Sequence, residues 1–243
     1  TVSISEEAGD HEACDSLYFN DTSSYVLLEH DSTGMAGSAT ATVEAWVKHQ
    51  GSDVQGNIFS QWATGSTGSG PVGFLLQVTP AHHLNVCLVS GACPYTATDA
   101  LPVDEWTHVA VVFDAGELSM YINGVLDLSW STGISTIGTA TNHTAIGCGQ
   151  RTDIHNFFGG IHDVRVWDTA RSGADIAANM NNPPSWDEAG LRGHWMLDEG
   201  EGSIAYDTSI EAADGSIVDG SWGTDCEYLM DGGTELLCHI DTE

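Results

Sequence analysis

Apolar residues fill both faces of the stretch from Val109 to Phe113, as expected of a strand sandwiched between two layers. After a turn at residues 114–116, apolar and polar residues alternate from Leu118 to Ile122, which is the pattern of a second strand. Asn123-Gly124 is a strong hairpin signal, because both residues tolerate the positive φ angles of a type I′ turn. The pattern predicts a strand, a tight turn, a second strand and a further turn between residues 104 and 128.

Strand patterns recur along the whole chain, and one segment is patterned as a helix. Further strands are predicted at Leu17–Leu28 (in two parts around Asn20-Asp21), Thr40–His49, Asn57–Gln61, Phe74–Val78, Leu84–Leu88, Ala145–Gly147 and Gly160–Trp167. Residues 172–180 are predicted as a short helix, because Ser172 can cap it, an acidic residue follows at the third helical position, and Pro183-Pro184 stops it. The sequence therefore predicts an all-β fold with one short helix.

The length of 243 residues fits one large all-β domain with a sizeable core, which the 8 Trp and 41% hydrophobic residues can supply. We interpret residues 1–243 as a single domain, with residues 1–13 as a flexible start. No stretch approaches the roughly 18 apolar residues that a membrane span needs. No signal peptide opens the chain, so we expect a secreted protein in its mature form.

The charge balance is extreme, with 35 Asp and Glu against 5 Lys and Arg and a net charge of −30. Such a surface repels phosphate backbones and anionic lipids, so neither nucleic acids nor membranes are expected partners. The carboxylates are scattered along the chain and do not form a calcium-loop repeat. We interpret them chiefly as a solubility device, with cation binding as the alternative.

The six cysteines, an even number, indicate an oxidising compartment, extracellular or at the cell surface. Local spacing favours one disulfide across a short loop, another across a terminal hairpin, and a third between the two cysteines that remain. These predicted pairs are Cys87–Cys93, Cys226–Cys238 and Cys14–Cys148. Six cysteines allow many other connectivities, so the spacing gives a preference and not a deduction.

Five sequence blocks, taken in order, resemble the laminin-G-like, concanavalin A-like jelly-roll domains, the superfamily that includes the pentraxins. The blocks are F-N-D-T-S-S-Y-V-L-L (19–28), T-V-E-A-W-V-K (42–48), W-T-H-V-A-V-V-F-D with L-S-M-Y-I-N-G (106–124), F-F-G-G-I-H-D-V-R-V-W-D-T-A-R (157–171) and G-L-R-G-H-W-M-L-D-E-G-E-G-S-I-A-Y-D-T-S (190–209). The resemblance spans most of the chain and implies an antiparallel jelly-roll β-sandwich. It specifies the fold more closely than the function, because one fold hosts many functions.

The end of the chain departs from the family order, in which the W-x-L-D-E-G-x-G block precedes the F-D-G-x-x-x-Y-V block. Here the first of these blocks begins at Trp195, and residues 226–241 echo residues 14–31. Two interpretations follow for residues 190–243. They close the chain's own sandwich, as in a circular permutation, or they are donated to a neighbouring copy and build a filament.

Catalysis is not expected, because the chain lacks the motifs that would support it. The glucanases of the superfamily use a strand-borne carboxylate pair, and no E-x-D-x-x-E pattern occurs here. The sequence also lacks H-E-x-x-H, G-x-S-x-G and G-x-x-x-x-G-K. Zinc is not expected either, since none of the 11 His or 6 Cys has the spacing of a structural zinc site.

The resemblance to pentraxins implies a calcium site on the rim loops, with oxygen donors of the kind that calcium prefers. The candidate ligands are Gln150, Asp153, Asn156, Asn20, Asp21 and Asp163. The first three lie in the run that matches the pentraxin site, the next two form a turn, and the last approaches that turn if the sheet edges meet. The alternative is that these are ordinary solvated loop residues. Calcium is the candidate cofactor.

Flat aromatic rings can stack on sugars, and two tryptophans that flank loops are candidates for this role, Trp62 and Trp130. Rim packing is the alternative for both. The tryptophans inside strand patterns are expected in the core; they are Trp46, Trp106, Trp167 and Trp195. Glu44 and Arg165 are charges within core-strand blocks, and we predict a partly buried ion pair between them.

These observations predict a secreted or surface-displayed binding and adhesion module without catalysis. Its expected ligand is a glycan or another extracellular protein, bound at rim loops with calcium as the candidate cofactor. The alternative is a self-assembling subunit of an extracellular filament or matrix, in which copies of the chain are joined by strand donation.

Overall fold

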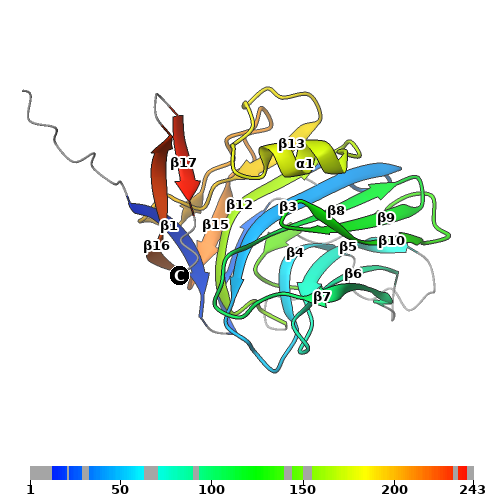
Figure 1. The fold of residues 1–243 in the computed structure, drawn as a ribbon, viewed down its shortest axis with the longest axis horizontal. Helices are drawn as coiled ribbons and strands as arrows, with labels where there is room; N and C mark the ends of the chain where they lie inside the picture. The colour runs from blue at the N-terminus through cyan, green and yellow to red at the C-terminus, as the bar shows by residue number, and fades with distance from the viewer. Residues whose placement is uncertain are drawn as a thin grey trace, which may run out of the picture.

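The computed structural model describes residues 13–20, 22–28, 33–62, 71–89, 93–139, 144–149, 155–231 and 235–239. These residues form two antiparallel sheets that pack face to face (Figure 1). The predicted all-β, jelly-roll sandwich is confirmed. Among the described residues, no helix is long and apolar enough to span a membrane.

Nine strands form the first sheet, which we call sheet 1. In sheet order they are β10 (Val125–Ser131), β9 (Glu117–Ile122), β8 (Thr107–Asp114), β3 (Thr40–His49), β12 (Gly159–Trp167), β1 (Ala13–Phe19), β16 (Ser221–Asp231) and β17 (Glu235–His239), with β13 (Leu191–Trp195) paired to the second half of β12. As predicted, β8 and β9 form a hairpin with its turn near residues 114–116. Asn123 and Gly124 both have positive φ in the turn after β9.

Eight strands form the second sheet, sheet 2. In order they are β14 (Ile204–Ala205), β15 (Gly215–Val218), β2 (Tyr25–Leu28), β11 (Thr144–Ile146), β4 (Gly56–Trp62), β5 (Pro71–Val78), β6 (His83–Val89) and β7 (Tyr95–Ala100). The predicted strands at 17–28 therefore belong to different sheets, and the segment at Asn20 crosses from one sheet to the other. Residues 203–231 pair with strands of their own chain, since β15 adds to β2 and β16 adds to β1.

The main core lies between the sheets and includes the inward side chains of β8, Val109, Val111 and Phe113. The other face of β8 is also covered, because Ala110 and Val112 pack with Ile176 of the helix α1 (Gly173–Asn179). Figure 1 shows this helix lying across sheet 1. A second apolar layer therefore explains why both faces of β8 are apolar in the sequence.

Helix α1 begins as the sequence predicts. The Ser172 side chain is the N-cap and accepts a hydrogen bond from the backbone N–H of Asp175 at 3.1 Å. Asp175 lies in the first turn, where a negative charge is favourable.

Of the tryptophans expected in the core, Trp195 is in it, Trp106 and Trp167 are buried, and Trp46 is half-buried with its indole N–H donating to the Met180 carbonyl at 2.9 Å.

A network of buried charges lies on the side of sheet 1 that faces α1. Arg165 donates two hydrogen bonds to the carboxylate of Asp163 and a third to the Asn179 carbonyl. Glu44 is directly across the ladder from Arg165, as expected, but its carboxylate lies 3.5 Å from the His108 ring and 3.5 Å from the Arg171 guanidinium. The predicted Glu44–Arg165 ion pair is therefore wrong in its contacts. A β-bulge between His162 and Arg165 accounts for this, because it brings Asp163 to the guanidinium.

The structure corrects the predicted cysteine pairing in part. Cys87 and Cys93 form a disulfide, as predicted. Cys148 is a buried free thiol, so the predicted Cys14–Cys148 bond is wrong. Burial raises the pKa of this thiol to about 12. Gly147 lies against the Phe19 ring, and Cys14 precedes Phe19 by five residues along β1. At about 3.3 Å per residue this separation is far beyond the reach of a disulfide.

We expect Cys14 and Cys226 to be joined instead. These residues are directly opposite each other in the β1–β16 ladder, whereas Cys238 is opposite Tyr228 and only diagonal to Cys226. Directly opposed residues are within the span of a disulfide, and diagonal neighbours generally are not. Peptide mapping of the oxidised protein by mass spectrometry should find the Cys14–Cys226 link. A Cys226–Cys238 peptide would contradict it.

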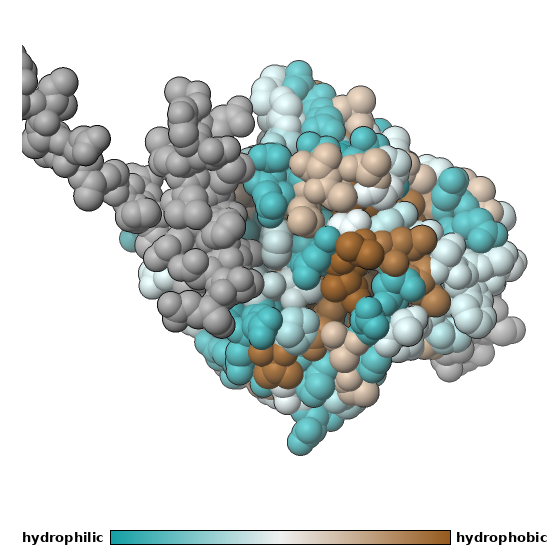
Figure 2. Space-filling view, in the orientation of Figure 1, coloured by the Kyte–Doolittle hydropathy of each residue, from teal (hydrophilic) through white to brown (hydrophobic). Residues whose placement is uncertain are grey.

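The edge strand β10 exposes apolar side chains. Figure 2 shows an apolar patch over β9 and β10, where Val125 is 69% and Leu126 is 52% exposed. Beside them a bulge at Asp127 aims its carboxylate at the edge of the other sheet. Its oxygens accept hydrogen bonds from the backbone N–H groups of Thr98 and Asp99, at 2.6 and 2.9 Å. This side chain joins the edges of the two sheets.

Replacing Asp127 with alanine is expected to lower the free energy of unfolding by about 1 kcal/mol, because two backbone donors of β7 lose a charged acceptor at a partly exposed site. Urea denaturation measures the change. Asp99→Ala is the matched control, since it removes the same charge and keeps the backbone N–H. Equal stability of the two variants would show that Asp127 does not join the sheets.

Candidate functional site

The structure places the predicted calcium ligands in different surroundings. Asn156 is buried, and its side-chain amide donates to the Ser24 carbonyl at 3.0 Å. Asn20 is exposed and donates to the Ser221 hydroxyl at 2.6 Å. Gln150, Asp153 and Asp21 lie outside the described residues.

Asp163 is buried beside other partners, and its place in a cation site with Asn20 and Asp21 stays a prediction. Both of its oxygens are hydrogen-bonded to Arg165, and one lies 2.9 Å from the His194 ring. Within the described ranges, no group of three or more His, Cys, Asp or Glu is placed to hold a metal ion. The calcium site at residues 150–156 stays a prediction.

The two tryptophans proposed as sugar platforms lie on strands of different sheets, Trp130 on β10 and Trp62 on β4. Trp130 is 51% exposed and packs edge-on against Tyr95, with ring centroids 6.3 Å apart. It is opposite Leu118 in the ladder, on the inward side of β10, and so covers the open edge of the sandwich. Trp62 ends β4, and its side chain lies outside the described part of the chain. Trp130 therefore combines rim packing with an exposed ring.

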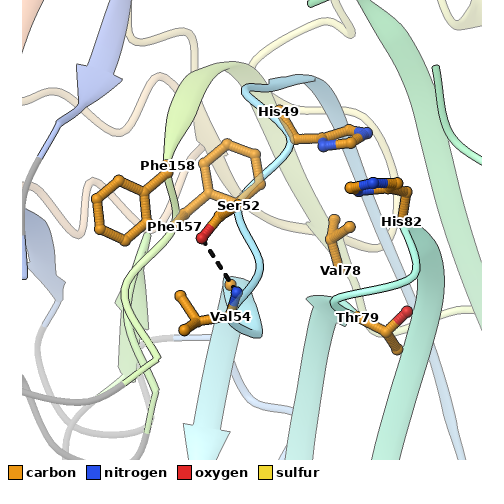
Figure 3. Close-up of a pocket in the computed structure, with 9 residues that line it drawn as sticks. His49, Ser52, Val54, Val78, Thr79, His82, Phe157 and Phe158 are labelled. Carbon is orange, nitrogen blue, oxygen red and sulfur yellow. Dashed lines mark hydrogen bonds between the residues drawn. The ribbon is translucent and has the colours of Figure 1, made fainter. Parts of the chain in front are cut away.

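A pocket of about 230 Å³, counting the part open to solvent, lies at the opposite end of the sandwich. Figure 3 shows the side chains around it, which come from the end of β3, the loop before β4, the β5–β6 turn and the segment before β12. Its lining residues are His49, Ser52, Val54, Gly56, Val78, Thr79, His82, Phe157 and Phe158. We call it the histidine pocket.

His49 and His82 form one wall of the histidine pocket. Their rings are stacked, 5.1 Å apart with an interplanar angle of 25°, as Figure 3 shows. The Nδ1 atom of His49 accepts from the Gly51 N–H at 3.2 Å, and its Nε2 lies 3.2 Å from the Leu101 carbonyl. A carbonyl only accepts, so the proton of His49 is on Nε2. Burial lowers the pKa of His49, and the ring is a fixed neutral wall.

His82 is set by a tight turn. Its φ is +67°, its N–H donates to the Thr79 carbonyl at 2.8 Å, and its carbonyl accepts from Leu101 at 2.7 Å. Its Nδ1 atom is buried and has no hydrogen-bond partner in the described residues. The His82 ring therefore lines the pocket, while its Nδ1 atom is buried without a described partner.

The rest of the pocket lining consists of apolar side chains and two side-chain hydroxyl groups. Val78 and Phe157 are buried and form the apolar part. The Ser52 hydroxyl accepts from the Val54 N–H at 3.2 Å (Figure 3), and the Thr79 hydroxyl accepts from the His83 N–H at 3.1 Å. Since each oxygen is already an acceptor there, both O–H groups can donate to a ligand.

A sequence profile described as the Concanavalin A-like lectin/glucanases superfamily (Laminin_G_3) matches residues 20–177, more than half of the chain. The chain belongs to this superfamily. The histidine pocket and the β8–β9 hairpin both lie within the matched region. A search among curated proteins found no match.

Several solved structures resemble this chain in fold. A Bacteroides ovatus protein to which carbohydrate binding is ascribed has a TM-score of 0.70 at 21% identity, covering 87% of this chain and 60% of that one. This chain thus spans about 60% of that protein's length. The heptameric SAP-like pentraxin of Limulus polyphemus has a TM-score of 0.53 at 19% identity, with coverage of 74% and 91%.

A third structure is the CBM40 domain of the Ruminococcus gnavus IT-sialidase, solved with α2,3 sialyllactose. Its TM-score is 0.57 at 16% identity, and the match covers 67% of this chain and 94% of that one. At these identities the likeness concerns the fold alone.

Sequence reasoning did not find the histidine pocket. His49 and His82 are 33 positions apart, one at the end of β3 in sheet 1 and the other in the β5–β6 turn of sheet 2, so no local pattern joins them. The one local signal is a polar loop residue at His82 within the Thr79–His83 turn, which sequence reasoning considered only as a metal ligand. The pairing of the two rings depends on how the ends of β3 and β6 meet.

Proposed function

We propose that this superfamily member is a non-catalytic carbohydrate-binding module, secreted or displayed at a cell surface, and that the histidine pocket holds a sugar residue. The observation that carries the proposal is the fixed, stacked imidazole pair beside an apolar floor and two donor hydroxyls. Ligand sites are mainly apolar and aromatic, with a few polar groups that orient the ligand. A sugar ring offers a matching apolar face and a rim of hydroxyls.

The size of the pocket supports recognition of one sugar residue of a longer chain. Its enclosed part is only about 10 Å³, room for about one water, so the pocket is a shallow surface that one sugar residue can cover and not a cavity that encloses a whole ligand. The neighbouring structures, a protein to which carbohydrate binding is ascribed and a domain solved with sialyllactose, favour the same ligand class.

The absence of a carboxylate from the described lining of the pocket supports binding without hydrolysis. Glycoside hydrolysis needs two carboxyl groups that flank the scissile bond. Here the lining consists of imidazole, hydroxyl and apolar groups, with one glycine. These groups can bind a sugar, but they supply no acid and nucleophile pair.

A glycan array with the labelled chain tests the proposal, run once with millimolar calcium and once with EDTA. We expect retained glycans in both runs, because the described pocket uses no metal ligand. Binding that disappears in EDTA would place calcium at the site, as the resemblance to pentraxins implies. No retained glycan in either run would overturn the proposal.

Replacing His82 with asparagine is expected to weaken glycan binding about tenfold, equivalent to roughly 1.4 kcal/mol. Asparagine tolerates the positive φ at this position, so the backbone is kept while the ring is removed. His83→Asn is the matched control, because His83 is the next residue and does not line the pocket. Calorimetric titration measures both, and equal affinities would place the site elsewhere.

A further inference from the structure

The cationic side chains that the structure describes are already engaged. Arg165 is bound to Asp163, Arg171 to Glu188, and Arg192 to Asp168 and Glu211. The three guanidinium groups lie on the side of sheet 1 near α1 and β13. Lys48 also carries an interaction, and the fifth cation, Arg151, lies outside the described residues.

The histidine pocket is bordered by negative charge. Asp53 is exposed and sits between Ser52 and Val54, which both line the pocket. Asp104 is exposed, its N–H donates to the His49 carbonyl at 2.9 Å, and its charge acts on the His49 ring. The lining itself has no Lys, Arg, Asp or Glu.

A ligand near this pocket also meets the field of the whole molecule, with a net charge of −30. Summed surface charge attracts or repels ligands over distances beyond direct contact. An acidic sugar would be repelled on approach and would then bring its carboxylate or sulfate against Asp53 and Asp104, without a described cation to receive it. A neutral sugar meets neither penalty.

Building on the proposed function, we infer that the histidine pocket selects glycans without acidic groups and rejects sialylated, uronic acid and sulfated glycans. The CBM40 domain solved with sialyllactose shares the fold. Ligand charge is set by the side chains at a site and not by the fold, so the two domains can differ in it.

The test compares each neutral glycan with an acidic derivative: lactose with α2,3 sialyllactose, which adds one sialic acid residue, and N-acetyllactosamine with its 6-sulfated form, which adds one sulfate group. Binding is measured in EDTA at 20 mM and at 500 mM NaCl, by array and then by calorimetry. We expect at least about tenfold stronger binding of the neutral members at 20 mM NaCl. The difference should narrow at 500 mM, because salt shortens the Debye length to a few ångströms.

Two double variants separate the charges at the pocket from the net charge. Asp53→Asn with Asp104→Asn should raise binding of the acidic members at least about threefold at 20 mM NaCl and leave the neutral members unchanged. Asparagine tolerates the positive φ of Asp104. Glu117→Gln with Glu201→Gln makes the same change in net charge at exposed positions that do not line the pocket.

The outcomes distinguish this inference from the proposed function. Equal or stronger binding of the acidic members in EDTA would overturn the inference and leave carbohydrate binding intact. Equal effects of the two double variants would overturn the role of Asp53 and Asp104. If no glycan of either charge binds at either salt concentration, the proposed function fails, and the inference fails with it.

Discussion

Replacing Arg165 with alanine is expected to lower the free energy of unfolding by about 3–5 kcal/mol, because it leaves a buried carboxylate without its partner. Arg165 and Asp163 are 1% and 6% exposed. Burial alone would raise the pKa of Asp163, but Arg165 and His194 outweigh it and hold that pKa well below its usual range. The same substitution also removes a donor from the Asn179 carbonyl at the end of α1.

Urea denaturation at neutral pH measures this loss, and two further variants make it interpretable. Arg165→Met keeps most of the side-chain volume, so it should remain destabilised if charge and hydrogen bonding matter more than packing. Arg192→Ala removes a cation that is 41% exposed and bound to two surface carboxylates, and should cost about 1 kcal/mol or less. If Arg165→Ala were as stable as Arg192→Ala, the buried network would have no role in stability.

Below pH 4.5 the stability of the protein is expected to fall by about 1.4 kcal/mol per pH unit because of His108, and more steeply below about pH 3.8, where Asp163 adds to the loss. Burial, with the nearby Arg165, lowers the pKa of His108 to about 3. The unfolded chain therefore binds a proton at this residue from about pH 6.5 downwards, while the folded chain binds it only near pH 3. The pKa of Asp163 is lowered in the folded chain, so acid also favours unfolding through this residue below its unfolded pKa of 3.8.

The pH range of the measurement matters because the titration of Glu44 changes the stability in the opposite direction at higher pH. Burial raises the pKa of Glu44, so above its unfolded value of 4.5 the folded chain retains a proton that the unfolded chain loses. Urea denaturation should therefore compare pH 4.5 with pH 3.5. His108→Gln should show a slope smaller by about 1.4 kcal/mol per pH unit. An unchanged slope in this variant would mean that His108 is not held neutral.

Local patterns predicted those parts of the fold that depend on neighbouring residues. A continuous apolar run predicted β8, alternation predicted β9, Asn123-Gly124 predicted the turn after β9, and Ser172 predicted the start of α1. Each of these features is decided within a few residues of the chain, so its signal is complete in the sequence.

Features that depend on contacts between distant strands were not predicted correctly. The Glu44–Arg165 pair was placed in the right ladder, but a bulge brings Asp163 to the guanidinium instead. The pairing of Cys14 failed because local spacing gives no information about the β1–β16 register. The histidine pocket was missed for the same reason, since its walls come from two sheets.

The charge and the pocket together give a coherent account of the module. The net charge of −30 is carried by an exposed surface whose few described arginines are paired with carboxylates, and the described lining of the pocket contains no Lys, Arg, Asp or Glu. Such a surface keeps the domain soluble and disfavours acidic polymers as ligands. Under the proposed function, the ligand that fits this lining is an uncharged sugar.

The most direct test of carbohydrate binding at the histidine pocket is a two-dimensional NMR titration of the labelled chain with the neutral glycan that binds most strongly on the array. We predict that the signals of residues 49–56, 79–82 and 157–158 shift together and saturate with one binding constant. The control region is the other rim, where Ser131 pairs with Glu117 beside the β8 end. Shifts centred on the Trp130 indole and residues 131–135, with none at His82, would contradict the account.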